Sequence, residues 1–303
     1  MKRVPTTEID RDRCTGCGLC VAVCPSQTLS LVDGKAVVTG TYSLECDHCA
    51  AICPEGAITV RGLDRDALTL ATIECRDDVV VPYGGFDTAR LVELMRSRRS
   101  CRLFSDRPVE RDILEDLIKI GMTAPSGTNS QRWTFTIVSN RSAVVMLGEL
   151  MADFFQRINR MAEKRLVRFF ARLFMRDALG TYYRNHYESV KEALRQWKEE
   201  GRDRLFHGAP AAILVGMKPG ASCPAEDALM ASQNILLAAH SMGLGSCLIG
   251  FAVEALRRDR RIKDYLGIPE NERIYAVIAL GYPRGDFMRP AGRKKVIPRY
   301  FGG

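Results

Sequence analysis

The chain lacks several features that would define its class. No apolar run approaches the length of about 18 residues that a membrane-spanning helix needs, and the start MKRVPTTEID lacks the apolar segment of a secretory signal. It also lacks a zinc-finger or helix-turn-helix signature and a basic ribbon interleaved with aromatics, so the net charge of +8 does not indicate nucleic-acid binding. We therefore expect a cytoplasmic protein with no transmembrane segment and no nucleic-acid partner.

Histidine is scarce as well, and no Ser/His/Asp triad or pair of carboxylates stands out among the four histidines and their neighbours. No residue is therefore assigned a catalytic role. At 303 residues and 46% hydrophobic composition, the chain exceeds one typical domain of roughly 100 to 200 residues and can bury a real core. These values predict two folded domains.

The cysteines are abundant and clustered. Seven of the eleven lie between Cys14 and Cys53 at gaps of two and three residues, which indicates metal ligation instead of disulfides. The first run, Cys14, Cys17, Cys20 and Cys24 followed by proline, has the C-x2-C-x2-C-x3-C-P spacing that holds a [4Fe–4S] cluster. A zinc site would normally separate two C-x2-C pairs by a longer loop.

A second run repeats the first at an offset of 29 residues. Cys46, Cys49 and Cys53 overlay the last three cysteines of the first run, while Ser43 stands where the first run has Cys14. Residues 1–62, which contain both runs, carry a net charge of −1, so residues 63–303 carry +9. The excess of positive charge in the longer part favours an anionic cofactor or substrate there.

Residues 1–62 resemble the two-cluster bacterial ferredoxins, a small α+β fold. In that family the fourth cysteine of each run ligates the other cluster, so the resemblance implies two ligand sets. The first set is Cys14, Cys17, Cys20 and Cys53, and the second is Cys24, Cys46, Cys49 and the Ser43 position. For the second site, ligation by the serine oxygen, entry of Cys75, a water ligand, a [3Fe–4S] centre and a cluster-free site all stay open. Cys75 is otherwise expected to be an ordinary buried thiol.

Residues 63–88, which include Pro82 and a Gly-Gly pair, are predicted to be a linker that lies across the next domain. Helical residues 89–95 then run into a basic cluster, in which guanidinium forks and a hydroxyl suit phosphate oxygens. An amphipathic helix at 113–122 and a strand at 134–138 flank a polar loop that suits a planar heterocycle. A helix at 226–242 ends in glycines that lack the G-x-G-x-x-G spacing and follow a helix, so no Rossmann unit is predicted. A last strand is expected at 273–280.

The pair of motifs RRSCRLF and APSGTNSQRW is similar to the nitroreductase family of flavoproteins over about residues 89–303. The resemblance implies an α+β FMN-binding fold and a homodimer with FMN at the subunit interface, where the loop at 126–129 serves the partner's flavin. The family usually has proline where this chain has Arg132. The implied cofactor-binding residues are Arg98, Arg99, Ser100, Arg102, Pro125, Ser126, Gly127, Asn129, Gln131, Leu248, Ile249, Gly250, Arg293 and Lys295.

Residues 151–207 are predicted to form a basic helical insertion, with thirteen Lys/Arg against eight Asp/Glu. It is interpreted as a lid or dimer arm, with contact to a membrane surface or recruitment of an anionic substrate as alternatives. The residues expected on one apolar helical face are Ile158, Met161, Phe169, Phe170 and Leu173.

Together these features predict an iron–sulfur flavoprotein oxidoreductase. Electrons would pass from an external low-potential donor, a ferredoxin-like protein or NAD(P)H, through [4Fe–4S] clusters to FMN and on to a small organic acceptor. A nitroaromatic, a quinone, an activated alkene or a halogenated aromatic would each suit. The alternatives are an electron-transfer or redox-sensing protein without turnover, and a dehalogenating or flavin-transforming enzyme of the same family.

Overall fold

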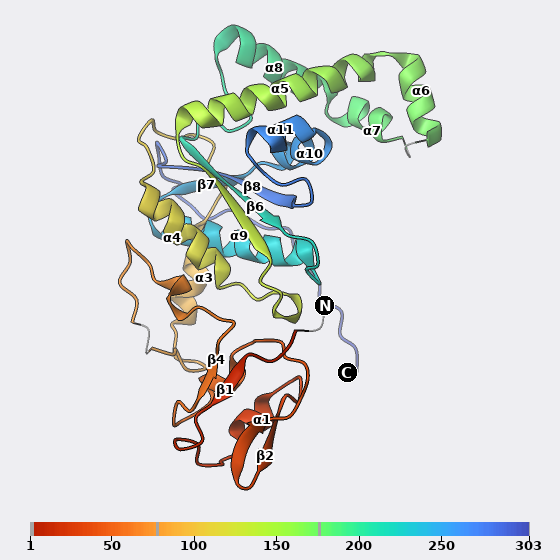
Figure 1. The fold of residues 1–303 in the computed structure, drawn as a ribbon. Helices are drawn as coiled ribbons and strands as arrows, with labels where there is room; N and C mark the ends of the chain where they lie inside the picture. The colour runs from red at the N-terminus through yellow and green to blue at the C-terminus, as the bar shows by residue number, and fades with distance from the viewer. Residues whose placement is uncertain (1–2, 77–78, 175–176, 303) are drawn as a thin grey trace.

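The N-terminal unit contains two small antiparallel pairs of strands. The computed structural model describes residues 3–76, 79–174 and 177–302. Strand β1 (Thr7–Ile9) pairs antiparallel with β4 (Ile58–Val60), and β2 (Leu29–Val32) pairs antiparallel with β3 (Lys35–Val38). Because β1 and β4 come from opposite ends of the unit, their pairing closes it around the two cysteine runs, at the foot of the molecule in Figure 1.

The sequence repeat is also a repeat of backbone conformation. Gly16 and Gly18 have φ of 73° and 77°, and the residues 29 positions later, Glu45 and Asp47, have φ of 51° and 60°. A short helix follows in each half, α1 (Leu19–Val23) and α2 (His48–Ala51). Glycine adopts this left-handed conformation without a steric penalty, whereas Glu and Asp adopt it at a cost. A side chain at position 16 would also collide with the carbonyl of Gly34.

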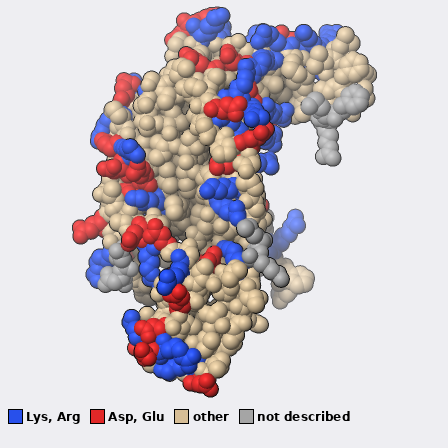
Figure 2. All heavy atoms as spheres, in the orientation of Figure 1, with Lys and Arg blue, Asp and Glu red and all other residues tan. Residues whose placement is uncertain are grey.

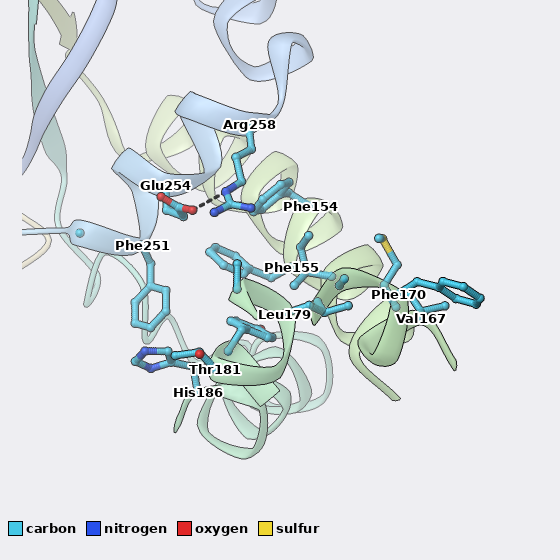
Figure 3. Close-up of a pocket in the computed structure, with 16 residues that line it drawn as sticks. Phe154, Phe155, Val167, Phe170, Leu179, Thr181, His186, Phe251, Glu254 and Arg258 are labelled. Atoms are coloured by element: carbon cyan, nitrogen blue, oxygen red, sulfur yellow. Dashed lines mark ion pairs between the residues drawn. The ribbon is translucent and has the colours of Figure 1, made fainter. Parts of the chain in front are cut away.

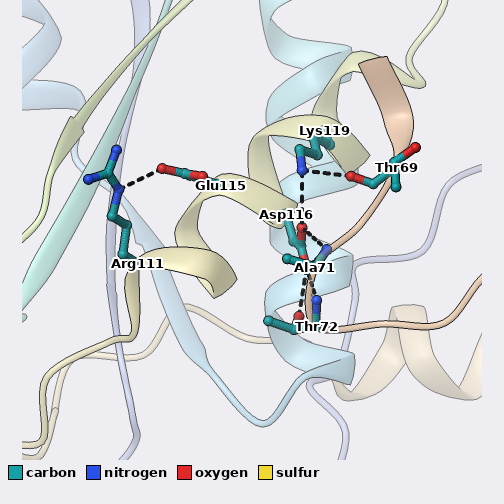
Figure 4. A network of polar contacts seen from close by, with 7 residues as sticks. All are labelled: Thr69, Ala71, Thr72, Arg111, Glu115, Asp116 and Lys119. Atoms are coloured by element: carbon teal, nitrogen blue, oxygen red, sulfur yellow. Dashed lines mark hydrogen bonds and ion pairs between the residues drawn. The ribbon is translucent and has the colours of Figure 1, made fainter. Parts of the chain in front are cut away.

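The segment that joins the two units packs along helix α4 (Arg111–Met122), as Figure 4 shows. After the 3-10 turn η1 (Arg65–Leu68), the backbone N–H groups of Ala71 and Thr72 donate to the carboxylate of Asp116 at 2.8 and 2.6 Å, and the Thr72 hydroxyl donates at 2.7 Å. Lys119 Nζ donates to the carbonyl of Thr69 at 2.6 Å. The joining segment is therefore tied to the larger unit through a fully buried carboxylate.

Removing this carboxylate should destabilise the protein. Burial alone raises the pKa of Asp116, but the N–H groups of Ala71 and Thr72 and the Thr72 hydroxyl outweigh it and lower the pKa. Asp116→Ala leaves those donors unpaired, so we expect the free energy of unfolding to fall by about 2–3 kcal/mol in urea denaturation at pH 7. A carboxyl whose pKa is lower in the folded state stabilises above its unfolded pKa of about 3.9. The difference from the wild type should therefore shrink as the pH falls below about 4.

Glu115→Ala is the matched control, because Glu115 lies on the same helix, has a side chain that is 41% exposed and, among the described residues, forms its ion pair with Arg111. We expect it to change the stability by about 0.5 kcal/mol or less. Equal losses in the two variants would show that the buried contact does not hold the joining segment.

The larger unit is an α+β structure around a four-stranded antiparallel sheet, as the sequence predicts. The strand order is β5 (Trp133–Val138), β6 (Ala211–Met217), β8 (Arg273–Gly281) and β7 (Gly245–Leu248). All seven residues of β6 are buried, since successive side chains point to opposite covered faces. Helices α4 and α9 (Pro224–Ser241) pack on one face, and α5 (Arg141–Glu163) and α10 (Gly250–Arg258) pack on the other.

The helices and strands expected at 89–95, 113–122, 134–138, 226–242 and 273–280 are confirmed, with ends shifted by two residues at most. They correspond to α3 (Thr88–Ser97), α4, β5, α9 and β8. A further short helix, α11 (Arg260–Tyr265), follows α10.

A helical arm extends from the far side of the sheet (Figure 1), formed by the end of α5 with α6 (Arg165–Phe174), α7 (Ala178–Asn185) and α8 (Tyr187–Glu200). The prediction of a single apolar face across this region is wrong. Helix α5 starts in the core at Arg141, and the chain becomes extended at Lys164. Ile158 and Met161 therefore lie on one helix, while Phe169, Phe170 and Leu173 lie on the next.

Basic side chains are distributed along this arm with acidic ones among them (Figure 2). On α8, for example, Arg195 pairs with Glu192 and Glu199 at 2.8 and 2.9 Å. Across the part of the chain that the structure describes, no helix is both long and apolar enough to cross a membrane.

Candidate functional site

The cysteines of the small unit surround two separate cavities. Cys14, Cys17, Cys20 and Cys53 line the first cavity. Cys24, Cys46, Cys49 and Ser43 line the second. The fold therefore brings the last cysteine of each run to the cavity of the other run, which is the grouping that the resemblance implies. In the described residues, no three His, Cys, Asp or Glu side chains could hold one metal ion between them.

Backbone N–H groups are directed at three of the cysteine sulfurs. The N–H of Thr28 lies 3.3 Å from Cys24 Sγ, and the N–H of Ala57, 29 residues later, lies 3.4 Å from Cys53 Sγ. The N–H of Ala36 lies 3.4 Å from Cys14 Sγ and, with that of Gly16, lowers the pKa of this thiol. Such donors favour the thiolate, which is the form that binds iron.

Ser43 supplies a hydroxyl to the second cavity. The residue is 8% exposed, and its Oγ accepts a hydrogen bond from the N–H of Glu45 at 3.0 Å. Cys75 is exposed and does not line the second cavity, so the expectation of an ordinary buried thiol is wrong. The serine therefore stands at the predicted fourth position beside three thiols.

A third cavity, of about 430 Å³, lies where the end of α3 meets the turn after α9. Arg98 and Arg99 line it together with Gly243, Gly245 and Ser246. The two segments are held together by the N–H of Cys101, which donates to the carbonyl of Ser246 at 2.9 Å. A Cβ at Gly245 would lie 2.7 Å from Cys101 Sγ, so the backbone needs glycine there. The basic cluster after α3 and the glycine-containing turn after α9 thus form one site.

This cavity suits an anionic ligand with hydrogen-bonding groups. The Ser246 hydroxyl is 1% exposed and, among the described residues, has no hydrogen-bond partner. Burial raises the pKa of Cys247 beside it, while the charges of Arg102 and Arg98 and a hydrogen bond with Ser100 oppose the rise. Arg98 and Arg99 therefore line the cavity beside the unsatisfied Ser246 hydroxyl, whereas Ser100 and Arg102 lie near Cys247 and do not line it.

Some lining residues were not identified from the sequence. His240 lines the cavity near the end of α9, and the segment 283–290 closes one side, where the Arg99 guanidinium lies 4.5 Å from the ring centre of Phe287. Arg289 is the basic residue that this segment contributes. Arg293 and Lys295 are exposed and lie outside the lining. The sequence could not indicate where these two residues lie, because an extended tail has no periodic apolar pattern.

The polar loop at 125–131 lies elsewhere, at the start of α9. Asp227 anchors it from the first turn of that helix, accepting from the N–H of Gly127 at 2.8 Å and from the Ser130 hydroxyl at 3.2 Å. Three loop residues, Thr128, Asn129 and Gln131, have positive φ. The sequence analysis missed Asp227, although a carboxylate in the first turn of a helix is a recognisable signal.

One chain does not bring all the predicted flavin-binding residues together. The loop lies at the start of α9 and the arginine cavity at its end, and an 18-residue helix is about 27 Å long. Of the segment 248–250, Leu248 is 46% exposed, Ile249 is buried and Gly250 lines another cavity. The predicted residues thus lie in separate places in a single chain.

That other cavity, of about 780 Å³, lies between α5, α6, α7 and α10 and is mostly apolar (Figure 3). Phe155, Phe251 and His186 surround the same space, and the Phe155 and Phe251 rings meet edge to face at 5.6 Å. Tyr182 also lines the cavity, and burial raises the pKa of its hydroxyl, which donates to Asn159 at 2.7 Å. The volume lies within the range of small-molecule sites.

Comparison with known proteins gives two family matches. A model described as the nitroreductase family matches residues 95–282, and a 4Fe-4S binding domain matches residues 7–30. A putative NADH dehydrogenase/NAD(P)H nitroreductase of Archaeoglobus fulgidus is 26% identical over 200 residues, 64% of this chain and 86% of that protein. An iodotyrosine deiodinase of Thermotoga neapolitana is 28% identical over 219 residues, 69% of this chain and 97% of that protein.

A solved structure has a similar fold. The crystal structure of a nitroreductase with bound FMN from Bacteroides fragilis superposes with a TM-score of 0.51 at 25% identity, covering 70% of this chain and 98% of that one.

Proposed function

The chain belongs to the nitroreductase family of FMN-dependent oxidoreductases and carries an N-terminal 4Fe-4S domain, and from this we propose that it passes electrons from iron–sulfur clusters to FMN and on to a small organic acceptor. The observation that carries the proposal is the grouping of seven cysteines and one serine around two cavities, in the same chain as a flavoprotein fold. A chain with such cavities and a flavin site is suited to accept single electrons from a donor and to deliver them in pairs to an acceptor.

The first cavity would hold a [4Fe–4S] cluster through its four cysteines. The second would hold a cluster through Cys24, Cys46 and Cys49, with the Ser43 hydroxyl as the fourth ligand or with a [3Fe–4S] centre that needs none. The N–H groups directed at Cys14, Cys24 and Cys53 stabilise negative charge on these sulfurs and raise the tendency of a cluster to accept an electron.

The arginine cavity would hold the FMN phosphate. Arg98 and Arg99, which line it, would provide charge-assisted hydrogen bonds, and Arg102 and the Ser100 hydroxyl, which lie near Cys247 outside the lining, would add a positive charge and a neutral donor. The loop at 126–131 would contact the flavin of a second subunit, since the length of α9 separates it from the cavity of its own chain. This separation supports a homodimer with FMN at the interface. When bound, FMN supplies a centre that accepts electrons singly and delivers them in pairs.

The apolar cavity beside Gly250 favours an uncharged aromatic acceptor. Its aromatic and aliphatic lining offers few partners to a charged group, while His186 and the paired Glu254 and Arg258 provide polar contacts. Reductive removal of a halide from an aromatic ring is a second candidate reaction, which the name of the iodotyrosine deiodinase relative favours. The name of the archaeal relative favours NAD(P)H as an alternative donor.

A reductive titration tests the proposal. The anaerobically purified protein should accept about four electrons per chain, about two into FMN and about one into each of two clusters, followed by absorbance and EPR. A count of about three with a flavin signal would mean that the Ser43 site holds no working cluster. A count of about two without any flavin signal would contradict the proposed function.

A further inference from the structure

We propose that Arg3 and Asn129 hold the second cysteine cavity against the polar loop at 125–131, called the flavin loop below, so that electrons leave the small unit through the Ser43 site. The proposal rests on the function above and adds the route. Asn129 and Arg3 are positioning residues here, because each acts by holding the two units together and neither needs to touch a reacting atom.

Arg3 joins the wall of the second cavity to the flavin loop. Its guanidinium donates to the carbonyl of Asn129 at 2.8 Å and also to the carbonyl of Thr128. Its own carbonyl accepts from the N–H of Ser43 at 3.0 Å. A single residue therefore connects the serine that lines the cavity with two loop residues of positive φ.

Asn129 makes the reciprocal contact from the loop. Its side-chain Nδ2 donates to the carbonyls of Glu45 and Leu44 at 2.7 and 3.3 Å, and its Oδ1 accepts from Gln131 Nε2 at 3.1 Å. Both polar atoms of the amide are thus engaged by protein groups, which differs from the sequence-based expectation that Asn129 binds FMN. Asparagine tolerates the left-handed φ of 51° that directs the side chain this way.

The contact between the two units is made beside the second cavity and not beside the first. Within the described residues, the hydrogen bonds between residues 3–62 and the larger unit all involve Arg3, Leu44 or Glu45. Leu44 and Glu45 line the second cavity, next to its ligand position Cys46, and neither lines the first. The shortest path of covalent and hydrogen bonds from a cluster ligand to the flavin loop therefore starts at the second cavity.

The proposed route consists of two one-electron transfers. Two equivalents of a low-potential one-electron donor, such as a reduced ferredoxin, would each give up one electron, and each electron would pass through the clusters held by the cysteines, which would return to their oxidised state. FMN, when bound, would take up the two electrons together with protons from water. Because the loop at 126–131 faces the flavin site of a second subunit in the proposed dimer, the electrons would reach the flavin held by the partner.

Hydrogen exchange on the holoprotein tests the docking without depending on turnover. In Asn129→Ala and in Arg3→Ala, we expect amide exchange at residues 43–47 to rise by about tenfold, because each variant loses the two side-chain hydrogen bonds that the residue makes between the units. Arg61→Ala is the matched control, since the Arg61 side chain is 70% exposed and pairs with Glu8 of the same unit at 2.6 Å. Unchanged exchange at 43–47 in both variants would overturn the docking.

The rate of flavin reduction tests the route. The holoprotein is mixed anaerobically with a reduced bacterial two-cluster ferredoxin, and the loss of visible flavin absorbance is followed. We expect about tenfold slower reduction in Arg3→Ala and Asn129→Ala, at unchanged iron, sulfide and FMN content, and no change in Arg61→Ala. An unchanged rate, or a loss of FMN confined to Asn129→Ala with normal reduction in Arg3→Ala, would overturn the route. If ferredoxin fails to reduce the wild-type flavin, the proposed function and the route both fail, while the exchange result still decides the docking.

Discussion

Replacing Cys53 with alanine should remove about half of the protein's iron, about four of about eight atoms per chain, and should remove it from the first cluster. Cys53 belongs to the second cysteine run, yet its side chain lines the cavity of Cys14, Cys17 and Cys20. A [4Fe–4S] cluster that loses one of its four thiolates has no substitute ligand of that kind in this cavity. Iron analysis together with EPR of the reduced protein measures the loss.

The same substitution should also destabilise the small unit. Its cluster of buried apolar residues has only six members, two of them cysteines, so the bound clusters must contribute to folding. We expect residues 3–62 of the Cys53→Ala variant to be cleaved by protease much faster than those of the wild type, while residues 89–302 persist.

Two further variants make this result specific. Cys75→Ala is the matched control, since Cys75 is exposed and lines neither cavity, and its iron content should match the wild type. Cys24→Ala, at the equivalent position of the first run, should instead remove the second cluster. If Cys24→Ala removes the first cluster and Cys53→Ala the second, each run holds its own cluster and the crossed arrangement is wrong.

Replacing Arg98 with alanine should weaken FMN binding by about 10- to 100-fold. Arg98 lines the arginine cavity and is only partly exposed, so a hydrogen bond from it to a phosphate would be partly shielded from water. Charge-assisted hydrogen bonds of this kind contribute about 1.5–3 kcal/mol, and about 1.4 kcal/mol corresponds to a factor of ten in affinity. Titration of the flavin-free protein with FMN, followed by flavin fluorescence, measures the change.

Arg96→Ala is the control for the loss of positive charge. Arg96 lies in the last turn of the same helix, is exposed and does not line the cavity. We expect it to change FMN affinity by about twofold or less, and by less still at high salt, where long-range attraction is screened. Equal weakening by the two substitutions would show that Arg98 acts through overall charge and does not contact the phosphate.

Features that depend on neighbours in the sequence could be predicted well. The cysteine spacing identifies iron–sulfur sites because three ligands of each set fall within seven residues of one another. Helices α4 and α9 and strands β5 and β8 were placed within a few residues, since their apolar patterns have the periods of these structures. The prediction of one apolar helical face from Ile158 to Leu173 failed because the break at Lys164 has no proline or glycine near it to indicate it.

The sequence by itself therefore determined the ligand types, the two-unit organisation and the motifs of a flavin site, because these are properties of short segments. Only the tertiary structure decided which segments meet. It placed Ser246 beside Arg98, placed Asp227 under the polar loop and set Asn129 against the backbone of the second cysteine run. It also set the polar loop and the arginine cavity at opposite ends of α9. Such contacts join residues up to about 150 positions apart and depend on the packing of the whole sheet and its helices, which no local pattern records.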